Sequence, residues 1–586
     1  MSPFKLKLAG EDISAHFSGL QLSQGVGMHH AFSLRISNED RAAHFKGSLA
    51  DVSKKWIGKP LQIEGFFEGV VTSVGMSRAK TGGSDFILHG SSPTILLDDG
   101  PNTRSFGEKT LKKILDEVLG PYEGKFSEVD IKPQYAAKIK YCVQYRESNF
   151  GFINRLAARY GEWFFYDGQK LFLGKPAAGK KIQLNFEREL TYLDVSLKTA
   201  PVQFKLKAYD YKNHQFPEKE SDYPSPGNEF AKIALDKSKN ELFTQKTTDP
   251  VLQSMSESDL GQLATLRQNT QMNELVVISG SSSNTDLRVG SVVEIVDPRS
   301  DLMAGGTENY GTYIITRLEH SFMTNGEGYA NQFEAVPEDT AVPPAHVSSD
   351  PPACEMQVGE VVDNNDPKTL GRVRVQFDWQ KSASGDDGKT NWIRVAAPMG
   401  GGDKGFYMIP EKGDQVLVAF EENHPERPFV LMPGMYHGKA KPEHANSNNY
   451  MKAIKTSGGH QILLTDEKGK ESMALSSPRD FSAAAAEGEM SLTAKGKITI
   501  RSDSGEITID TPAKIVIHAA NIEINGDSSI KLGAPKIEIS ANAELNAQAA
   551  KVSIQGQASA DFVGNGKVNI SSSGVTTLSG SMLKLN

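Results

Sequence analysis

The sequence predicts a multidomain protein that is mainly β, with an α+β N-terminal region, a small closed barrel and a repetitive β-structure in its last part. A chain of 586 residues is too long for one hydrophobic core, so several domains are expected. Short apolar runs separated by Gly, Pro, Asn and Asp recur along it, which is typical of strands joined by turns. From residue 489 onward, apolar residues recur in pairs spaced by two, the spacing of side chains on one face of a strand.

The N-terminal region, residues 1–335, mixes strand patterns with three amphipathic helices. We expect helices over Lys109–Leu119, Ser148–Tyr160 and Asp259–Asn273, because their apolar residues return at helical spacing. A glycine follows each of the first two, where a helix commonly ends. Helices with one apolar face that interrupt a series of strands pack on a sheet, so this region is predicted to be α+β.

A proline-rich linker, residues 336–355, separates this region from a second domain. Proline fixes φ and lacks an N–H donor, so the linker is expected outside any central strand. Residues 356–438 then carry five or six short strand patterns, among them Trp392–Ala397 and the alternating segment Arg372–Trp379, which a predicted turn at Asn365–Gly371 precedes. That many short strands in so few residues predicts a small closed barrel of the OB-fold type. We interpret residues 439–488 as a neck.

The tail, residues 489–586, repeats a pair of apolar side chains every six to nine residues. Gly, Asn, Asp, Ser or Pro usually stands between successive pairs, so each repeat is interpreted as a short strand followed by a corner. Stacking about twelve such strands at roughly 4.8 Å gives a shaft on the order of 60 Å long. The residues predicted to form the shaft core are Ile498, Ile500, Ile507, Ile509, Ile515, Ile517, Ile522, Ile524, Ile530, Leu532, Ile537, Ile539, Val552, Ile554, Val568 and Ile570.

The narrow core of this shaft predicts three chains. Two inward side chains per strand fill only a thin cross-section, and the repeat leaves no room for the longer turns with which a lone chain closes its own coil. Three chains, each contributing one face, would enclose such a core and pair every strand edge with a neighbour. The sequence therefore predicts an intertwined, triple-stranded β-helix needle in a homotrimer. A single-chain solenoid and a hairpin-rich adhesin stalk are the structural alternatives.

Composition argues against several classes of protein. The formal net charge is −8, whereas a surface for nucleic acid or anionic lipid needs a basic excess. No apolar run approaches the roughly 20 residues of a membrane-spanning helix, and the N-terminus lacks the apolar core of a signal peptide. Cys142 and Cys354 are the only cysteines, which fits a reducing cytosol. We expect a cytoplasmic protein that binds no nucleic acid.

Three motifs suggest chemistry, and each is weak. Gly174–Lys181 nearly matches a phosphate-binding loop, but Lys181 replaces the Ser or Thr that holds Mg²⁺, so a hairpin loop is expected. His29 and His30 would point to opposite faces of a strand. His424–Glu426 has the His-x-Glu spacing of zinc deaminases without their Cys-x-x-Cys. We therefore expect no catalytic residue, no metal ligand, no cofactor and no enzyme activity; a carbohydrate-active β-helix enzyme is the alternative in the enzyme class.

Several segments resemble the VgrG family and the related tail hub proteins of contractile phages. Tyr145–Asp167 is similar to a helix-then-strand motif of the family's hub, and Asp366–Trp379 and Pro410–Phe420 are similar to its barrel. Ser457–Leu475 is similar to the neck that leads into the family's needle. The resemblance covers essentially the whole chain, and it implies phage-hub-like N-terminal barrels, an OB-fold collar and a β-helix needle.

The resemblance also implies a function and partners. It implies a homotrimeric, membrane-puncturing spike that caps the inner tube, an Hcp-like hexamer, among the baseplate proteins of a contractile injection machine, as in type VI secretion. A PAAR-type tip protein would dock at Leu583, Leu585 and Asn586, and effector cargo would carry any toxic activity. Such a spike stays in the cytoplasm until firing, is then translocated without a signal peptide, and contacts the target membrane only at that moment. The spike of an extracellular injection particle or of a phage tail is the alternative that the sequence leaves open.

Overall fold

The computed structural model describes residues 4–37, 45–78, 80, 84–176, 180–186, 188–298, 308–323, 328–344 and 351–585. Strands hold 33% of the residues and helices 14%, so the chain is mainly β, as predicted. Contacts divide it into two compact units, Met1–Pro478 and Arg479–Asn586. The division falls within the predicted neck.

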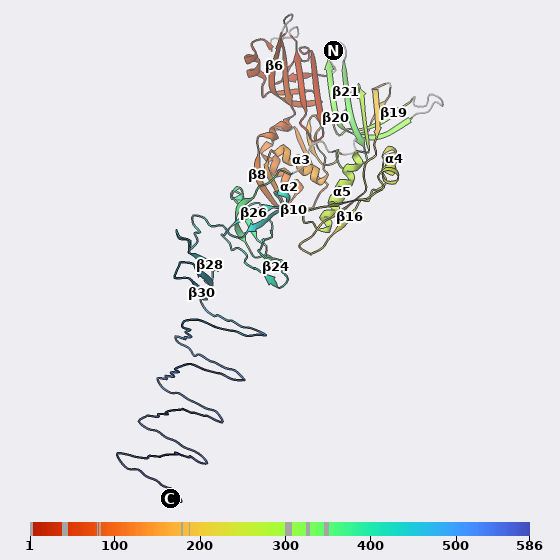
Figure 1. Ribbon diagram of the computed structural model, residues 1–586. Helices are drawn as coiled ribbons and strands as arrows, with labels where there is room; N and C mark the ends of the chain where they lie inside the picture. The colour runs from red at the N-terminus through yellow and green to blue at the C-terminus, as the bar shows by residue number, and fades with distance from the viewer. Residues whose placement is uncertain are drawn as a thin grey trace. The chain divides into compact units, whose positions relative to one another are not determined.

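A sheet of thirteen strands is the framework of the first unit (Figure 1). Its path is β14-β18-β21-β20-β3-β4-β7-β6-β5-β1-β2, and β19 joins β20 while β13 joins β19. Strands β20 and β3 pair antiparallel and link the early and late parts of the region, with Arg317 opposite Gly25 and Met323 opposite Gly19. Its strands are β1 (Leu6–Leu8), β2 (Glu11–Asp12), β3 (Gly19–Gly25), β4 (Ala31–Ile36), β5 (Pro60–Ile63), β6 (Phe67–Arg78), β7 (Ser84–Ser91), β13 (Ile182–Asn185), β14 (Leu190–Leu197), β18 (Val276–Ser282), β19 (Val292–Asp297), β20 (Glu308–Met323) and β21 (Tyr329–Pro337).

Within the described residues, five α-helices accompany the sheets: α1 (Leu49–Trp56), α2 (Leu111–Leu119), α3 (Asn149–Tyr160), α4 (Glu229–Lys237) and α5 (Glu257–Asn273). Helices α2, α3 and α5 confirm the three predicted ones. Each begins after a hydroxyl side chain, on Thr110, Ser148 or Ser256, that accepts a backbone N–H three residues on. Helices α1 and α4 were not predicted; their buried apolar residues are Val52 and Trp56 in α1, and Ala231, Ala234 and Leu235 in α4.

Among the described residues, small sheets complete the region before the linker. Strands β8 (Asn102–Thr110) and β10 (Lys138–Glu147) pair antiparallel as a two-stranded sheet, and a three-stranded sheet joins β9 (Glu128–Ile131), β12 (Lys170–Leu173) and β11 (Phe164–Tyr166). A second three-stranded sheet joins β16 (Glu218–Glu220), β15 (Phe204–Lys207) and β17 (Thr247–Pro250), and it packs against α5 around a separate small core. The region is therefore α+β, as predicted.

The second domain has a four-stranded sheet in the order β23-β22-β26-β27. Its strands are β22 (Gln357–Asp363), β23 (Arg374–Phe377), β26 (Gln415–Phe420) and β27 (Pro428–Met432), and a small hairpin joins β24 (Gly400–Gly401) to β25 (Lys404–Gly405). The pattern at Trp392–Ala397, a predicted strand, forms only isolated bridges, from Ile393 to Val373 and from Val395 to Val430.

The predicted turn before β23 is fixed by a buried ion pair. Asp366 accepts the backbone N–H groups of Lys368 and Leu370 and binds the Arg372 guanidinium at 2.6 Å. The hydrogen bond that Arg372 donates to Asp366 is the main reason why the pKa of this carboxyl group is well below its usual range. Local sequence thus sets the start of β23.

The end of the first unit is a three-stranded antiparallel sheet of β28 (Met451–Lys455), β29 (Gln461–Thr465) and β30 (Ser472–Ser476). The second unit is the tail. Its described residues, 479–585, contain no strand, although short strands were predicted there. A strand is defined by a hydrogen-bonded neighbour, and one chain of this tail supplies none: residues 481–585 share no backbone–backbone hydrogen bond.

Candidate functional site

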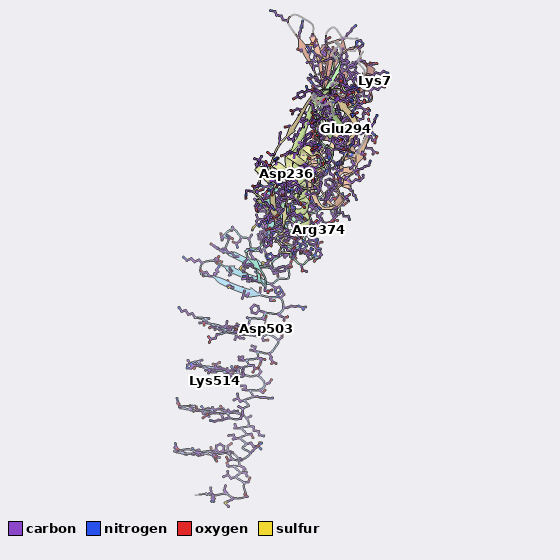
Figure 2. The ribbon with its side chains drawn as sticks, turned by 90° about the vertical axis from the view of Figure 1, so that its right-hand side faces the viewer. Lys7, Asp236, Glu294, Arg374, Asp503 and Lys514 are labelled. Carbon is purple, nitrogen blue, oxygen red and sulfur yellow. The ribbon has the colours of Figure 1, made fainter. Side chains whose placement is uncertain are left out.

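The tail exposes its apolar pairs in a regular manner. The eight first members of the pairs predicted for the shaft core have 51% to 57% of their surface exposed, and the eight second members 65% to 71%. Figure 1 draws the second unit as successive wide turns, and Figure 2 shows side chains such as those of Asp503 and Lys514 with no second layer packed against them. A single chain therefore places these apolar side chains in register and buries none of them.

This conformation has no internal support. Neither a buried apolar cluster nor a backbone–backbone hydrogen bond lies within residues 481–585. Folding must offset about 1–2 kcal/mol of conformational entropy per ordered backbone residue. Contiguous exposed apolar surface of this extent marks an interaction site in soluble proteins. The sixteen predicted residues thus form one candidate interface along the tail.

The sequence prediction missed one apolar pair of the tail, and one of its docking residues lies outside the described residues. Met490 and Leu492 precede Ile498 at the same spacing and are 62% and 70% exposed. Counting methionine among the apolar residues would have found them. Leu583 and Leu585, the predicted docking residues for a tip protein, are exposed, whereas Asn586 lies outside the described residues.

A second candidate site is the joint between the N-terminal region and the barrel, both within the first unit. Tyr141, Val143 and Tyr145 of β10 are buried in the same cluster as the core residues of the barrel, among them Val375 and Val416. The hydroxyl of Tyr145 also donates to Glu355 at 2.8 Å, just before β22. Strand β10 thus supplies part of the core of the second domain.

Glu426 lies at the centre of this joint. It belongs to the short segment between β26 and β27, and its side chain contacts helix α3. Its carboxylate, 2% exposed, pairs with Arg159, lies 3.6 Å from Arg155 and accepts the backbone N–H of Val143 at 3.2 Å. Arg155 also binds Glu147 at 2.6 Å. Burial by itself raises the pKa of Glu426, but the attraction of Arg159 and Arg155 outweighs it and lowers the pKa to about 2. The carboxylate is therefore charged and fully paired.

Asp387 binds β8, the other strand of the two-stranded sheet that β10 forms with β8. Its side chain accepts the N–H of Gly107 at 2.9 Å and the Lys109 ammonium at 2.5 Å, and its backbone carbonyl accepts the Ser105 hydroxyl at 2.5 Å. Only glycine fits at position 107, because a Cβ there would lie 2.5 Å from the carbonyl oxygen of Asp386. The barrel thus binds β8 through Asp387 and β10 through Glu426.

The weak chemical motifs have structural roles or stay unassigned. Strands β12 and β13, which flank Gly174–Lys181, belong to different sheets, so the predicted hairpin loop is wrong; residues 177–179 of this segment lie outside the described residues. His29 and His30 directly precede β4, so the prediction that they lie within a strand is wrong; His29 contacts Thr94 and Asp98, whereas His30 contacts Gln24. His424 accepts the backbone N–H of Glu426 at 3.1 Å. Across the described residues, no group of three His, Cys, Asp or Glu side chains is placed to hold a metal ion.

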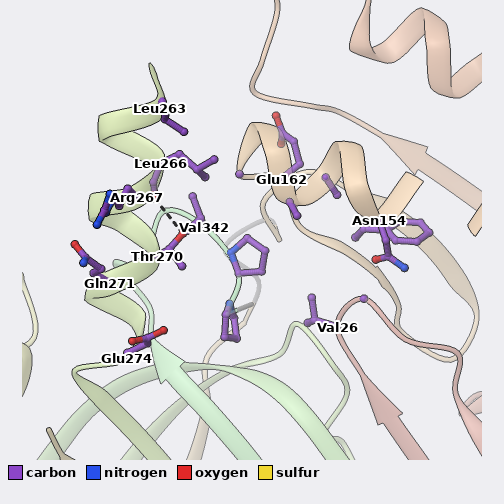
Figure 3. A pocket seen from close by; sticks show the side chains of 17 residues that line it. Val26, Asn154, Glu162, Leu263, Leu266, Arg267, Thr270, Gln271, Glu274 and Val342 are labelled. Carbon is purple, nitrogen blue, oxygen red and sulfur yellow. Dashed lines mark hydrogen bonds between the residues drawn. The ribbon is translucent and has the colours of Figure 1, made fainter. Parts of the chain in front are cut away.

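A cavity of about 520 Å³ lies between α5 and the end of α3 (Figure 3). Leu263 and Leu266 line it on one side, and the segment 342–344 lines it at the start of the linker. The backbone carbonyl of Val342 accepts the Asn273 side chain at 2.7 Å, and a Cβ at Gly161 would lie 2.7 Å from a Val342 methyl group. The contacts fix the first residues of the linker on the N-terminal region.

Two buried histidines form a polar network inside the large sheet. Gln24 donates to Nδ1 of His30 at 3.0 Å and accepts from Nε2 of His320 at 2.8 Å, and the other nitrogen of His320 contacts the Tyr329 hydroxyl at 2.8 Å. Burial is the main cause that lowers the pKa of both histidines to about 3. Both rings are therefore neutral at pH 7.

Acidification from pH 7 to pH 5 is expected to destabilise this part of the sheet. The unfolded histidines bind protons below pH 6.5 and the folded ones only near pH 3, so the free energy of unfolding falls through this window, by about 2 kcal/mol per histidine at pH 5. Hydrogen exchange of β3 and β20, corrected for its intrinsic pH dependence, measures the loss. His320→Gln should flatten the dependence, and His89→Gln on the exposed face of β7 should not. An equal pH dependence in wild type and His320→Gln contradicts this assignment.

Two family models match the two domains of the first unit. The model of the phage tail baseplate hub (GPD) matches residues 27–326, just over half of the chain, and the model of the type VI secretion system/phage-baseplate injector OB domain matches residues 357–436. A hub domain joined to an injector OB-fold barrel defines the class of baseplate hub and injector proteins. The chain belongs to the VgrG family of this class.

Curated relatives carry names from that family. The actin cross-linking toxin VgrG1 of Vibrio cholerae is 24% identical over 424 residues, which is 65% of this chain and 36% of the relative. The type VI secretion system spike protein VgrG4b of Pseudomonas aeruginosa is 30% identical over 165 residues, 26% of this chain and 20% of the relative. The chain thus spans between a fifth and two fifths of the length of the curated relatives it matches.

Two solved structures align with most of this chain. A chain of the lidded Francisella PdpA–VgrG complex, which shows the same fold, aligns with a TM-score of 0.50 at 9% identity, over 81% of this chain and 80% of that chain. An Escherichia coli component of the type VI secretion system, described as similar to T4 bacteriophage tail proteins, aligns with a TM-score of 0.48 at 16% identity, over 73% of this chain and 99% of that chain. Among the described residues, no helix combines the length and apolarity that crossing a membrane requires.

Proposed function

We propose that this chain is the trimeric, membrane-puncturing spike of a contractile injection machine of the type VI secretion kind. The observation that carries the proposal is the tail, whose regular apolar pairs are all exposed in a single chain. Joined to a hub domain and an injector OB-fold barrel, such a tail is suited to be a shaft. Three chains winding around one another would bury the pairs and provide each strand with hydrogen-bonded neighbours.

The proposed puncturing mechanism depends on the rigidity of the shaft. A shaft whose backbone groups are all paired between chains has no free edge at which to come apart, and its dry apolar core resists bending because packed interiors deform little. In this proposal the hub caps an Hcp-like hexameric tube, contraction of the machine drives the trimer outward, and the shaft enters the target envelope. The chain itself contributes mechanical strength and no catalysis.

Partners are proposed on the same basis. The Francisella neighbour is a VgrG bound to PdpA, which is consistent with a hub and barrel that carry other proteins. We assign effector cargo and a PAAR-type tip protein to this spike, with the tip protein docking on the apolar end of the tail at Leu583, Leu585 and Asn586. The protein is proposed to stay in the cytoplasm until firing and to leave it by translocation.

The mass of the protein in solution tests the central element. Light scattering should give about three times the chain mass of 63.7 kDa, and the trimer should persist in mild detergent, because its core is a continuous dry interface. A monomer, or a different stoichiometry, contradicts the shaft. Deletion of the gene for this chain in a strain with an active contractile system should then abolish delivery of effectors. Delivery that continues without the protein contradicts the spike role.

A further inference from the structure

We propose that the joint between the hub and the barrel, centred on Glu426 and Asp387, is the path by which thrust passes from the hub to the collar, and that the proline-rich linker carries no load. The proposal rests on the proposed function for its mechanical meaning. The joint itself is a property of the first unit and can be tested without any injection machine.

The first argument is that the barrel binds the two-stranded sheet of β8 and β10 at two separated places. Asp387 binds three groups on β8, namely Ser105, Gly107 and Lys109, and Gln380 adds a bond to the Ser105 hydroxyl at 2.7 Å. Glu426 binds β10 and α3 on the other side. One attachment would allow rotation about it, whereas two attachments on neighbouring strands oppose both rotation and sliding.

The second argument is that the two domains share a hydrophobic core at the joint. Tyr141 and Val143 of the hub are 5% and 0% exposed among the residues of the barrel core. Separating the two domains would leave this core open and would expose the paired charges of Glu426, Arg155 and Arg159. Buried groups that are fully paired hold one geometry, because every displacement leaves a charge without its partner.

The third argument concerns the linker. Its first residues are fixed on the hub through Asn273 and Val342, and its last are fixed on the barrel, where the Cys354 N–H donates to the carbonyl of Asn423 at 2.8 Å. Both ends of the linker are thus held beside domains that already contact one another. A connection that spans two bodies in direct contact is not needed to transmit compression between them.

A protein nicked in the linker tests this joint. A protease recognition sequence is inserted between Pro351 and Pro352 of the full chain, the protein is cleaved, and the hub fragment is followed in a pull-down through a C-terminal tag. The nicked wild-type protein should retain its hub fragment. The nicked Glu426→Gln/Asp387→Asn variant should release it about thirtyfold faster or more, because one side of each charge contact is removed.

The matched control is the Asp378→Asn/Glu443→Gln variant, which removes two carboxylates whose side chains are 89% and 61% exposed. It should retain the hub fragment like the wild type. Release of the fragment from the nicked wild type, or full retention by the nicked joint variant, overturns the proposal. If the uncleaved double variant has lost its trimer or its strand content, the Asp387→Asn variant alone carries the test, with the same two outcomes.

An assay in cells separates this inference from the proposed function. With the linker intact, the joint variant should deliver about tenfold less effector than the exposed-carboxylate control, since thrust then passes through the linker alone. Equal delivery by both variants overturns the load path. Failure of the wild-type protein to form a trimer or to support delivery would instead contradict the spike role, whatever the nicked protein does.

Discussion

Replacing Ile515 and Ile517 together with Asp is expected to abolish the trimer. Both side chains belong to one pair of the tail and lie on one face of the predicted strand, 51% and 69% exposed in the single chain. In a trimer the double substitution would place six carboxylates in a narrow apolar core, and each unpaired buried charge costs several kcal/mol. Light scattering should therefore report monomers in place of trimers.

The residue between them is the matched control. Val516 is 70% exposed and, at the alternate position of the strand, points to the opposite face. Val516→Asp adds the same charge within the same repeat but on the outside of the shaft, so its trimer should be as stable as that of the wild type. A trimer of normal stability in the Ile515/Ile517 variant, or its loss in the Val516 variant, would show that the faces of the tail are assigned wrongly.

Replacing Glu426 with Ala is expected to destabilise the first unit by about 3–5 kcal/mol, because Arg155 and Arg159 lose their common partner while both stay in the joint. Denaturant titration measures this loss, and hydrogen exchange should locate it in β10 and α3. Asp378→Ala, which removes a carboxylate that is 89% exposed, should change stability by less than about 1 kcal/mol.

The same carboxylate predicts an acid response with a defined window. The folded pKa of Glu426 is about 2 and its ordinary value is 4.5, so its contribution is complete above pH 4.5 and is lost as the pH falls toward 2. The difference corresponds to a loss on the order of 3 kcal/mol. In the Glu426→Ala variant this part of the pH dependence should disappear. If wild type and variant lose stability in parallel between pH 4.5 and 2, the pairing does not stabilise the joint.

Elements that depend on nearby residues could be predicted from the sequence. Helices α2, α3 and α5 follow from their apolar spacing and their capping hydroxyls, and the turn before β23 follows from the residues Asp366 to Arg372. The predicted strand at Trp392–Ala397 was wrong because an alternating pattern does not say whether a neighbour lies close enough to form a ladder. Here Val373 and Val430 supply only single bridges.

The sequence alone determined the repetitive tail and the order of hub and barrel, because side-chain period and turn residues are local properties of a chain. Only the tertiary structure decided how hub and barrel are joined. Glu426 was considered as part of a weak metal motif, yet its partners are Arg155 and Arg159, from a helix in another domain. No spacing in the sequence relates residues so far apart, since folding alone brings them together and burial alone makes their pairing strong. A single chain of the tail buries none of the predicted core pairs, so their burial requires contacts between chains.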